Sequence, residues 1–159
     1  MVDTSEHILL VAALFIFALL QLGLTRVLLN NNKAMVRTEL DYTAVALAQN
    51  IADESRTKAF DEASTGSYIP LKVPDDFSLI GSDMGETYPY FDDFDDYHNY
   101  TRTDTTQHGI YKTKCRVEYM QESDLSQVSS VKTAYKRLHV EVVSETQDTV
   151  GVTYIKSYY

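Results

Sequence analysis

The chain has 159 residues, which is room for one small domain plus an anchoring segment. Its formal net charge of −9 argues against a nucleic-acid partner, because binding to phosphates requires clustered Lys and Arg. The single cysteine, Cys115, excludes a disulfide within the chain.

The first predicted element is a hydrophobic helix within residues 1–32, with its apolar run at residues 8–29. Four less apolar residues interrupt this run: Gln21, Gly23, Thr25 and Arg26. A helix of this length spans about 33 Å, which is enough to cross a hydrocarbon core of roughly 30 Å. The rest of the chain is too small to cover such a helix on all sides, so we interpret the run as membrane-capable. The acids Asp3 and Glu6 stand where a conventional secretory signal carries bases, which disfavours a cleaved signal of that type.

Residues 33–64 are predicted to continue the helix as an amphipathic segment. Its apolar residues recur at spacings of 4, 4, 3 and 4 and therefore share one face: Val36, Leu40, Ala44, Leu47 and Ile51. No proline separates the two segments, so we predict one helix from about Ile8 to about Glu62, followed by stop signals at Ser64, Gly66 and Pro70. Its weakest positions by helix propensity are expected to loosen when the helix packs: Gly23, Asn30, Asn31 and Asn32.

Residues 112–159 change to a period of two and are predicted to form an antiparallel sheet of three or four strands. The runs are Lys112–Met120, Lys136–Val143 and Val150–Tyr158. The sheet is expected to rest on the apolar stripe of the amphipathic helix, so the predicted fold class is α+β. In these runs Cys115 is interpreted as a small buried hydrophobe, and His139 is expected to be exposed.

Residues 65–111 are predicted to be an acidic, Tyr-rich connection with few periodic features. Within it, residues 75–104 hold nine acids against one base, Arg102. One interpretation is a solvated loop in which Phe91, Phe94 and Tyr97 turn inward and the Asp pairs stay in water.

Two other interpretations of this segment remain open. Oxygen ligands at calcium-loop spacing suggest a weak calcium site, although His98 replaces the turn glycine: Asp93, Asp95, Asn99, Thr101 and Asp104. Alternatively, the acidic loop of one copy could contact basic strand residues of another: Lys112, Lys114, Arg116, Lys132, Lys136 and Arg137.

The sequence carries no pattern that predicts an enzyme. It has no Gly-rich phosphate loop, no G-x-S-x-G and no Cys-x-x-Cys, and its four histidines lack zinc-type spacing: His7, His98, His108 and His139. We therefore predict no catalytic residues and no cofactor, with calcium as the one ion that the acidic segment suggests.

The layout resembles the type IV pilin and pseudopilin superfamily. The resemblance rests on an acid ahead of an apolar helix, on the amphipathic continuation ALAQNIADESRTKAFDE at 46–62, and on the C-terminal sheet. FDDFDDYHNYT at 91–101 and YKRLHVEVVSET at 135–146 look like minor pilins of the mannose-sensitive-haemagglutinin type. The resemblance implies a structural subunit of a pilus or secretion pseudopilus, whose partners are copies of itself or other pilin-like subunits. It also implies a cell-envelope location, in the inner membrane before assembly and in an extracellular or periplasmic filament afterwards.

In that family a glutamate follows the mature N-terminus, and the matching residue here is Glu6. An ionised acid at a bilayer centre costs about 2.5–3.5 kcal/mol, and pairing with the N-terminal amine of the next subunit would relieve this cost and set axial register. The alternative is a headgroup-level Glu6 that favours a helix N-terminus. The expected assembly surface comprises Glu6, Ile8, Leu10, Val11, Leu14, Phe15, Phe17, Leu20, Leu22 and Leu24. The alternative function is a monomeric, single-pass envelope protein with a ligand- or calcium-binding β domain.

Overall fold

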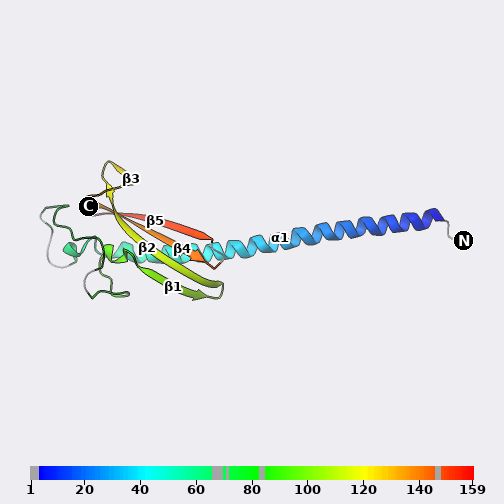
Figure 1. Cartoon of the computed structure of the whole chain (residues 1–159), viewed down its shortest axis with the longest axis horizontal. Coiled ribbons are helices and arrows are strands. Elements are labelled where there is room, and N and C mark those ends of the chain that lie inside the picture. Colours follow the sequence, from blue (N-terminus) through cyan, green and yellow to red (C-terminus); the bar gives the residue numbers. More distant parts are fainter. Residues whose placement is uncertain (1–3, 66–69, 71, 83–84, 146–147) are drawn as a thin grey trace. The chain divides into compact units, whose positions relative to one another are not determined.

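The computed structural model contains one long helix followed by five strands (Figure 1). It describes residues 4–65, 70, 72–82, 85–145 and 148–159, so Asp3, Gly66 and Asp83 lie outside the described residues. The chain divides into two compact units, Met1–Glu39 and Leu40–Tyr159, which we call the N-terminal unit and the C-terminal unit.

Helix α1 spans Thr4–Thr57 without interruption, which confirms that the apolar and amphipathic segments belong to one helix. Gly23 and the three asparagines at 30–32 are helical in this single chain. The helix ends five residues before the predicted Glu62, which belongs instead to the 3-10 turn η1 (Glu62–Ser64). Asp61 begins this turn, because its side chain accepts the N–H of Ala63 (3.2 Å) and therefore caps a new turn instead of extending α1.

The sheet is antiparallel, with strand order β1-β2-β4-β5 and with β3 paired to β2. Its strands are β1 (Thr101–Thr106), β2 (Gly109–Gln121), β3 (Asp124–Val128), β4 (Tyr135–Ser144) and β5 (Thr149–Ser157). The three predicted runs correspond to β2, β4 and β5, so the α+β fold class is confirmed. The predicted count of three or four strands is wrong, because β1 lies inside the expected connection and β3 was not anticipated.

The core of the C-terminal unit forms where the last part of α1 packs on the sheet. Ala44, Ala48 and Ile51 of α1 are buried together with Val117 of β2 and Leu138 of β4. In Figure 1 this part of α1 runs beside β2 and β4. The predicted stripe is therefore confirmed from Leu40 onward, with Ala48 as an unpredicted member. It is wrong at Val36, which is 53% exposed and belongs to the N-terminal unit.

The segment between α1 and β1 contributes to the core. Phe91, Phe94 and Tyr97 are buried against the helix and sheet, which confirms that these aromatic residues turn inward. The prediction that the Asp pairs stay in water is wrong, because Asp95 and Asp96 are almost completely buried. Their burial is possible because backbone N–H groups and a lysine of the sheet hydrogen-bond to the buried carboxylates of this segment.

Candidate functional site

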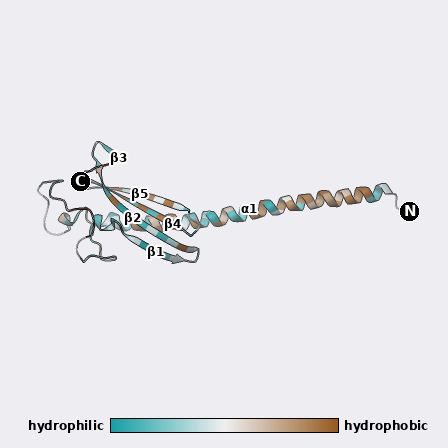
Figure 2. Cartoon of the chain, viewed as in Figure 1, coloured by the Kyte–Doolittle hydropathy of each residue, from teal (hydrophilic) through white to brown (hydrophobic). Residues whose placement is uncertain are grey.

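The first candidate site is the apolar surface of α1, which we define as residues 8–29. The nine predicted apolar assembly residues are between 56% and 69% exposed: Ile8, Leu10, Val11, Leu14, Phe15, Phe17, Leu20, Leu22 and Leu24. Figure 2 shows this stretch as the most continuous hydrophobic part of the helix. The helix is long and apolar enough to cross a membrane, and no residue of its most apolar window is buried. Exposed apolar surface of this extent indicates an interaction with lipid or with other protein chains.

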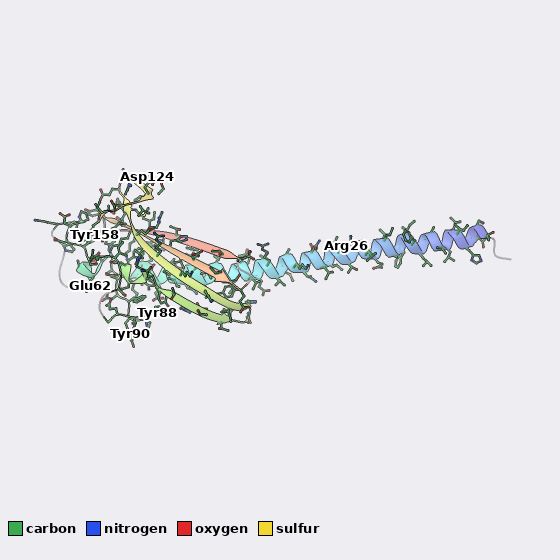
Figure 3. All side chains as sticks on the ribbon, viewed as in Figure 1. Arg26, Glu62, Tyr88, Tyr90, Asp124 and Tyr158 are labelled. Carbon is green, nitrogen blue, oxygen red and sulfur yellow. The ribbon has the colours of Figure 1, made fainter. Side chains whose placement is uncertain are left out.

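Polar groups on the apolar surface are few and partly satisfied within the helix. The Thr25 hydroxyl donates to the carbonyl oxygen of Gln21 (2.9 Å), which removes one polar group that would otherwise need an outside partner. Arg26 is the charged residue of this stretch (Figure 3). Glu6 lies exposed in the first turn of α1, where a carboxylate interacts favourably with the free N–H groups of the helix N-terminus.

The second candidate site is a buried charge cluster in the C-terminal unit, comprising Lys136, Asp61, Asp95 and Asp93. The Lys136 side chain is completely buried, and its Nζ donates to Asp95 Oδ1 (2.5 Å), Asp61 Oδ2 (2.6 Å) and the carbonyl oxygen of Phe60 (3.0 Å). All three ammonium protons therefore have acceptors. This arrangement lets a lysine occupy a position that is normally apolar.

Aromatic rings enclose the buried charge cluster. The Lys136 Nζ lies 4.7 Å from the ring centroid of Phe60, 5.3 Å from that of Tyr119 and 5.8 Å from that of Phe77. These rings attract the ammonium electrostatically and keep bulk water away from it. The Tyr119 hydroxyl also donates weakly to Asp61 Oδ2 (3.5 Å).

The three carboxyl groups of the cluster differ in protonation because their surroundings differ. Burial alone would raise the pKa of Asp61, but the Lys136 ammonium and the N–H groups of Ser78 and Ala63 outweigh it and lower that pKa. Burial raises the pKa of Asp95, and the nearby ammonium offsets this only partly. Burial, together with the charges of Asp95 and Asp96, raises the pKa of Asp93 to about 8. At neutral pH the cluster therefore contains an ionised Asp61 and a protonated Asp93.

Two other lysines, Lys156 and Lys132, donate hydrogen bonds to backbone carbonyl groups between α1 and β1. Lys156 of β5 donates to the carbonyl oxygens of Lys58 and Ala59 (3.1 Å to Ala59), close to the end of α1. Lys132 donates to the carbonyl oxygen of Phe77. Two of the bases that were expected to reach another copy, Lys132 and Lys136, therefore bond within their own chain.

Arg137 also finds a partner within the chain, in Glu118 of β2 (2.9 Å). The exposed bases Lys112, Lys114 and Arg116 lie at outward-facing positions of β2, and Arg116 also pairs with Glu118 (2.6 Å). The complete burial of Lys136 excludes it from the basic residues that could face another copy.

The residues of the suggested calcium loop have other partners in the structure. Asp93 Oδ1 accepts the N–H groups of Asp95 (2.8 Å) and Asp96 (3.1 Å), and Asp95 bonds to Lys136. Asp104 pairs with Arg102 (2.5 Å). Asn99 has a positive φ of 61° and occupies the turn that precedes β1.

A second group of acidic residues, outside the suggested calcium loop, has its carboxylate atoms close together. Among the described residues, the carboxylate atoms of Glu62, Glu86 and Asp92 lie within 4.8 Å of one another. Burial, together with the neighbouring Asp96, raises the pKa of Glu86 to about 7. Such partly exposed acidic groups are common without an ion, and we assign no metal to this one.

The buried charge cluster was missed in the sequence, although one signal for it was present. Lys136 is in phase with Leu138, Val140 and Val142, so the alternation of β4 already places it on the inward face. Its acidic partners come from separate parts of the chain, and local patterns do not identify such partners.

A long N-terminal helix packed on an antiparallel sheet is a pilin-like architecture, and this chain has that architecture. The helix is also compatible with membrane association by length and composition. No protein-family model, curated protein or solved structure matches the chain.

Proposed function

We propose that the chain is a non-enzymatic structural subunit of a type IV pilus-like or pseudopilus filament. The observation that carries the proposal is the apolar surface at residues 8–29, which the chain itself leaves exposed. In the inner membrane this surface contacts lipid. In the filament it packs against the helices of neighbouring subunits, and the C-terminal unit faces outward.

The driving force for assembly differs from that of ordinary burial in water. Each large apolar side chain removed from water contributes about 1.5–3 kcal/mol, but lipid already provides this gain. Helices that leave lipid for a filament therefore associate through close packing and through the pairing of polar groups. This reasoning gives Glu6 a role in assembly that a plain membrane anchor does not need.

The geometry of an open filament follows from the same surface. A helix that presents apolar side chains around its circumference contacts unlike faces of several neighbours, and such head-to-tail contacts generate open helical assemblies when they do not close into a ring. The apolar surface includes leucines and phenylalanines on all sides of α1, as this arrangement requires.

The experiment compares Glu6→Ala with Asp53→Ala, a matched removal of an exposed acid from the same helix. Sheared cell-surface material is imaged by negative-stain microscopy with an antibody to the C-terminal unit, and membranes are fractionated in parallel. We expect wild type and Asp53→Ala to form labelled filaments, and Glu6→Ala to remain in the membrane fraction without filaments.

Two results separate the alternatives. Normal filaments from Glu6→Ala would remove the pairing role of Glu6 but leave the filament proposal standing. If the wild-type protein stays in the membrane as single copies and enters no filament, the chain is a single-pass envelope protein and the proposal is wrong.

A further inference from the structure

The ammonium of Lys136 and the carboxyl of Asp95 are held against each other in the buried charge cluster. Lys136 Nζ lies 2.5 Å from Asp95 Oδ1, and both side chains are almost completely shielded from solvent. We propose that these two side chains condense into an intramolecular amide bond, which covalently links η2 (Asp95–Tyr97) to β4. This inference does not depend on the filament proposal.

The fold brings the two reacting groups together from distant positions. Lys136 lies at the start of β4, where β2 and β5 flank it on both sides. Asp95 begins η2, and its N–H is fixed by Asp93 Oδ1. Holding two reactants in contact converts a bimolecular reaction into an intramolecular one, with effective concentrations that solution chemistry does not reach.

Each step of the condensation has a group in the cluster to carry it. Asp61, whose Oδ2 lies 2.6 Å from Nζ, accepts one proton from the Lys136 ammonium. The free amine then attacks Cγ of Asp95, and a new C–N bond forms. Asp93 is hydrogen-bonded to the Asp95 side chain and donates its proton to the departing oxygen.

The atoms and charges of this reaction balance. One C–O bond of Asp95 breaks, and its oxygen leaves as water with one proton from Lys136 and one from Asp93. The amide nitrogen keeps one proton, and Asp61 holds the last one. Asp93 ends ionised and Asp61 ends neutral, so no oxidant, reductant or further reactant is needed.

The surroundings favour the amide over the ion pair. In water a separate ammonium and carboxylate are stabilised by hydration, but here Phe60, Phe77 and Tyr119 replace the solvent around Lys136. Conversion to a neutral amide removes two buried charges from these surroundings. The same rings exclude the water that would reverse the reaction.

The supporting protonation states are those that the reaction requires. The raised pKa of Asp93, about 8, leaves it protonated at neutral pH, and the lowered pKa of Asp61 leaves it able to accept a proton. An ordinary buried ion pair needs neither a neutral acid beside the carboxylate nor a second carboxylate on the amine.

The test is the intact mass of the full chain, purified in detergent and then denatured. We expect the wild-type mass to be lower than the sequence mass by one water molecule. Tryptic digestion is expected to yield one branched peptide in which Lys136 is joined to Asp95, with no cleavage after Lys136. A wild-type chain at its full mass would overturn the proposal.

Variants show whether the lost water comes from this bond. Lys136→Met is expected to have its full mass, and Lys114→Arg, an exposed lysine of β2, is expected to lose water like the wild type. Asp93→Asn keeps both reacting groups and the acceptor for the backbone N–H groups but lacks the acid, so we expect mostly unreacted chain. If Lys136→Met still lacks one water, the modification lies elsewhere and the proposal is wrong.

Discussion

The two parts of α1 differ in how much of their surface the chain itself covers. In the C-terminal unit the buried apolar residues of the helix form a narrow stripe, Ala44, Ala48 and Ile51, that packs on the sheet. In the N-terminal unit the apolar residues surround the helix, and all of those that the structure describes are exposed. The helical backbone is the same, so the distribution of apolar side chains around the helix distinguishes the part that packs on its own sheet from the part whose surface stays exposed.

We expect the largest difference in the free energy of unfolding between two leucine-to-alanine substitutions, one in each unit. Leu138→Ala leaves a cavity in the core of the C-terminal unit, and we expect it to lower the free energy of unfolding by about 2–5 kcal/mol. Leu14→Ala removes a side chain that is 60% exposed, and we expect no measurable change in the same quantity. Urea unfolding in detergent, followed by the near-ultraviolet signal of the tyrosines, measures both. Equal losses would show that residue 14 also belongs to the folded core.

A smaller effect is expected at the end of α1. Lys156→Met removes the donor that satisfies carbonyl oxygens just beyond Thr57, and we expect a loss of about 1 kcal/mol in the free energy of unfolding. Lys114→Met, on the exposed side of β2, is the matched control and should change stability little. Faster hydrogen exchange confined to the last turn of α1 in Lys156→Met would locate the effect, and unchanged exchange there would contradict it.

The smallest effect concerns Cys115 and becomes visible only at high pH. Burial raises the pKa of the Cys115 thiol to about 12, above its ordinary value near 9. The unfolded chain loses the thiol proton first, so this contribution to stability is intact below pH 9 and declines as pH rises from about 9 to 12. Iodoacetamide should leave the folded protein unlabelled at pH 9 and label it after denaturation. Rapid labelling of the folded protein would contradict the burial of Cys115.

The elements that were predicted correctly are those with a strong local pattern. Strands β2, β4 and β5 alternate apolar and polar residues, and α1 repeats apolar residues at helical spacing. Strand β1 was missed because TRTDTT has no apolar face, and β3 was missed because all its residues are exposed. The prediction at Val36 was wrong because the helical spacing of apolar residues includes this position although it is exposed. Periodicity does not reveal where along a helix the covering sheet begins.

The buried charge cluster could be predicted only in part. The phase of β4 places Lys136 inward, but Asp61 and Asp95 reach it from the starts of the short turns η1 and η2. A run such as FDDFDDY is dominated by acids, and high charge normally indicates a solvated surface. The contacts that overturn this expectation are long-range, so they appear only in the folded chain.

The central claim is that neighbouring copies cover the apolar surface at residues 8–29. Its most direct test is a photoreactive phenylalanine analogue placed at Phe15 and, as a control, at the exposed Tyr90 of the C-terminal unit (Figure 3). Intact cells are irradiated, and the crosslinked products are identified by mass spectrometry. We expect position 15 to join copies of the chain through residues of their own N-terminal helices. Capture of lipid alone at position 15, in a chain that stays in single copies, would contradict the claim.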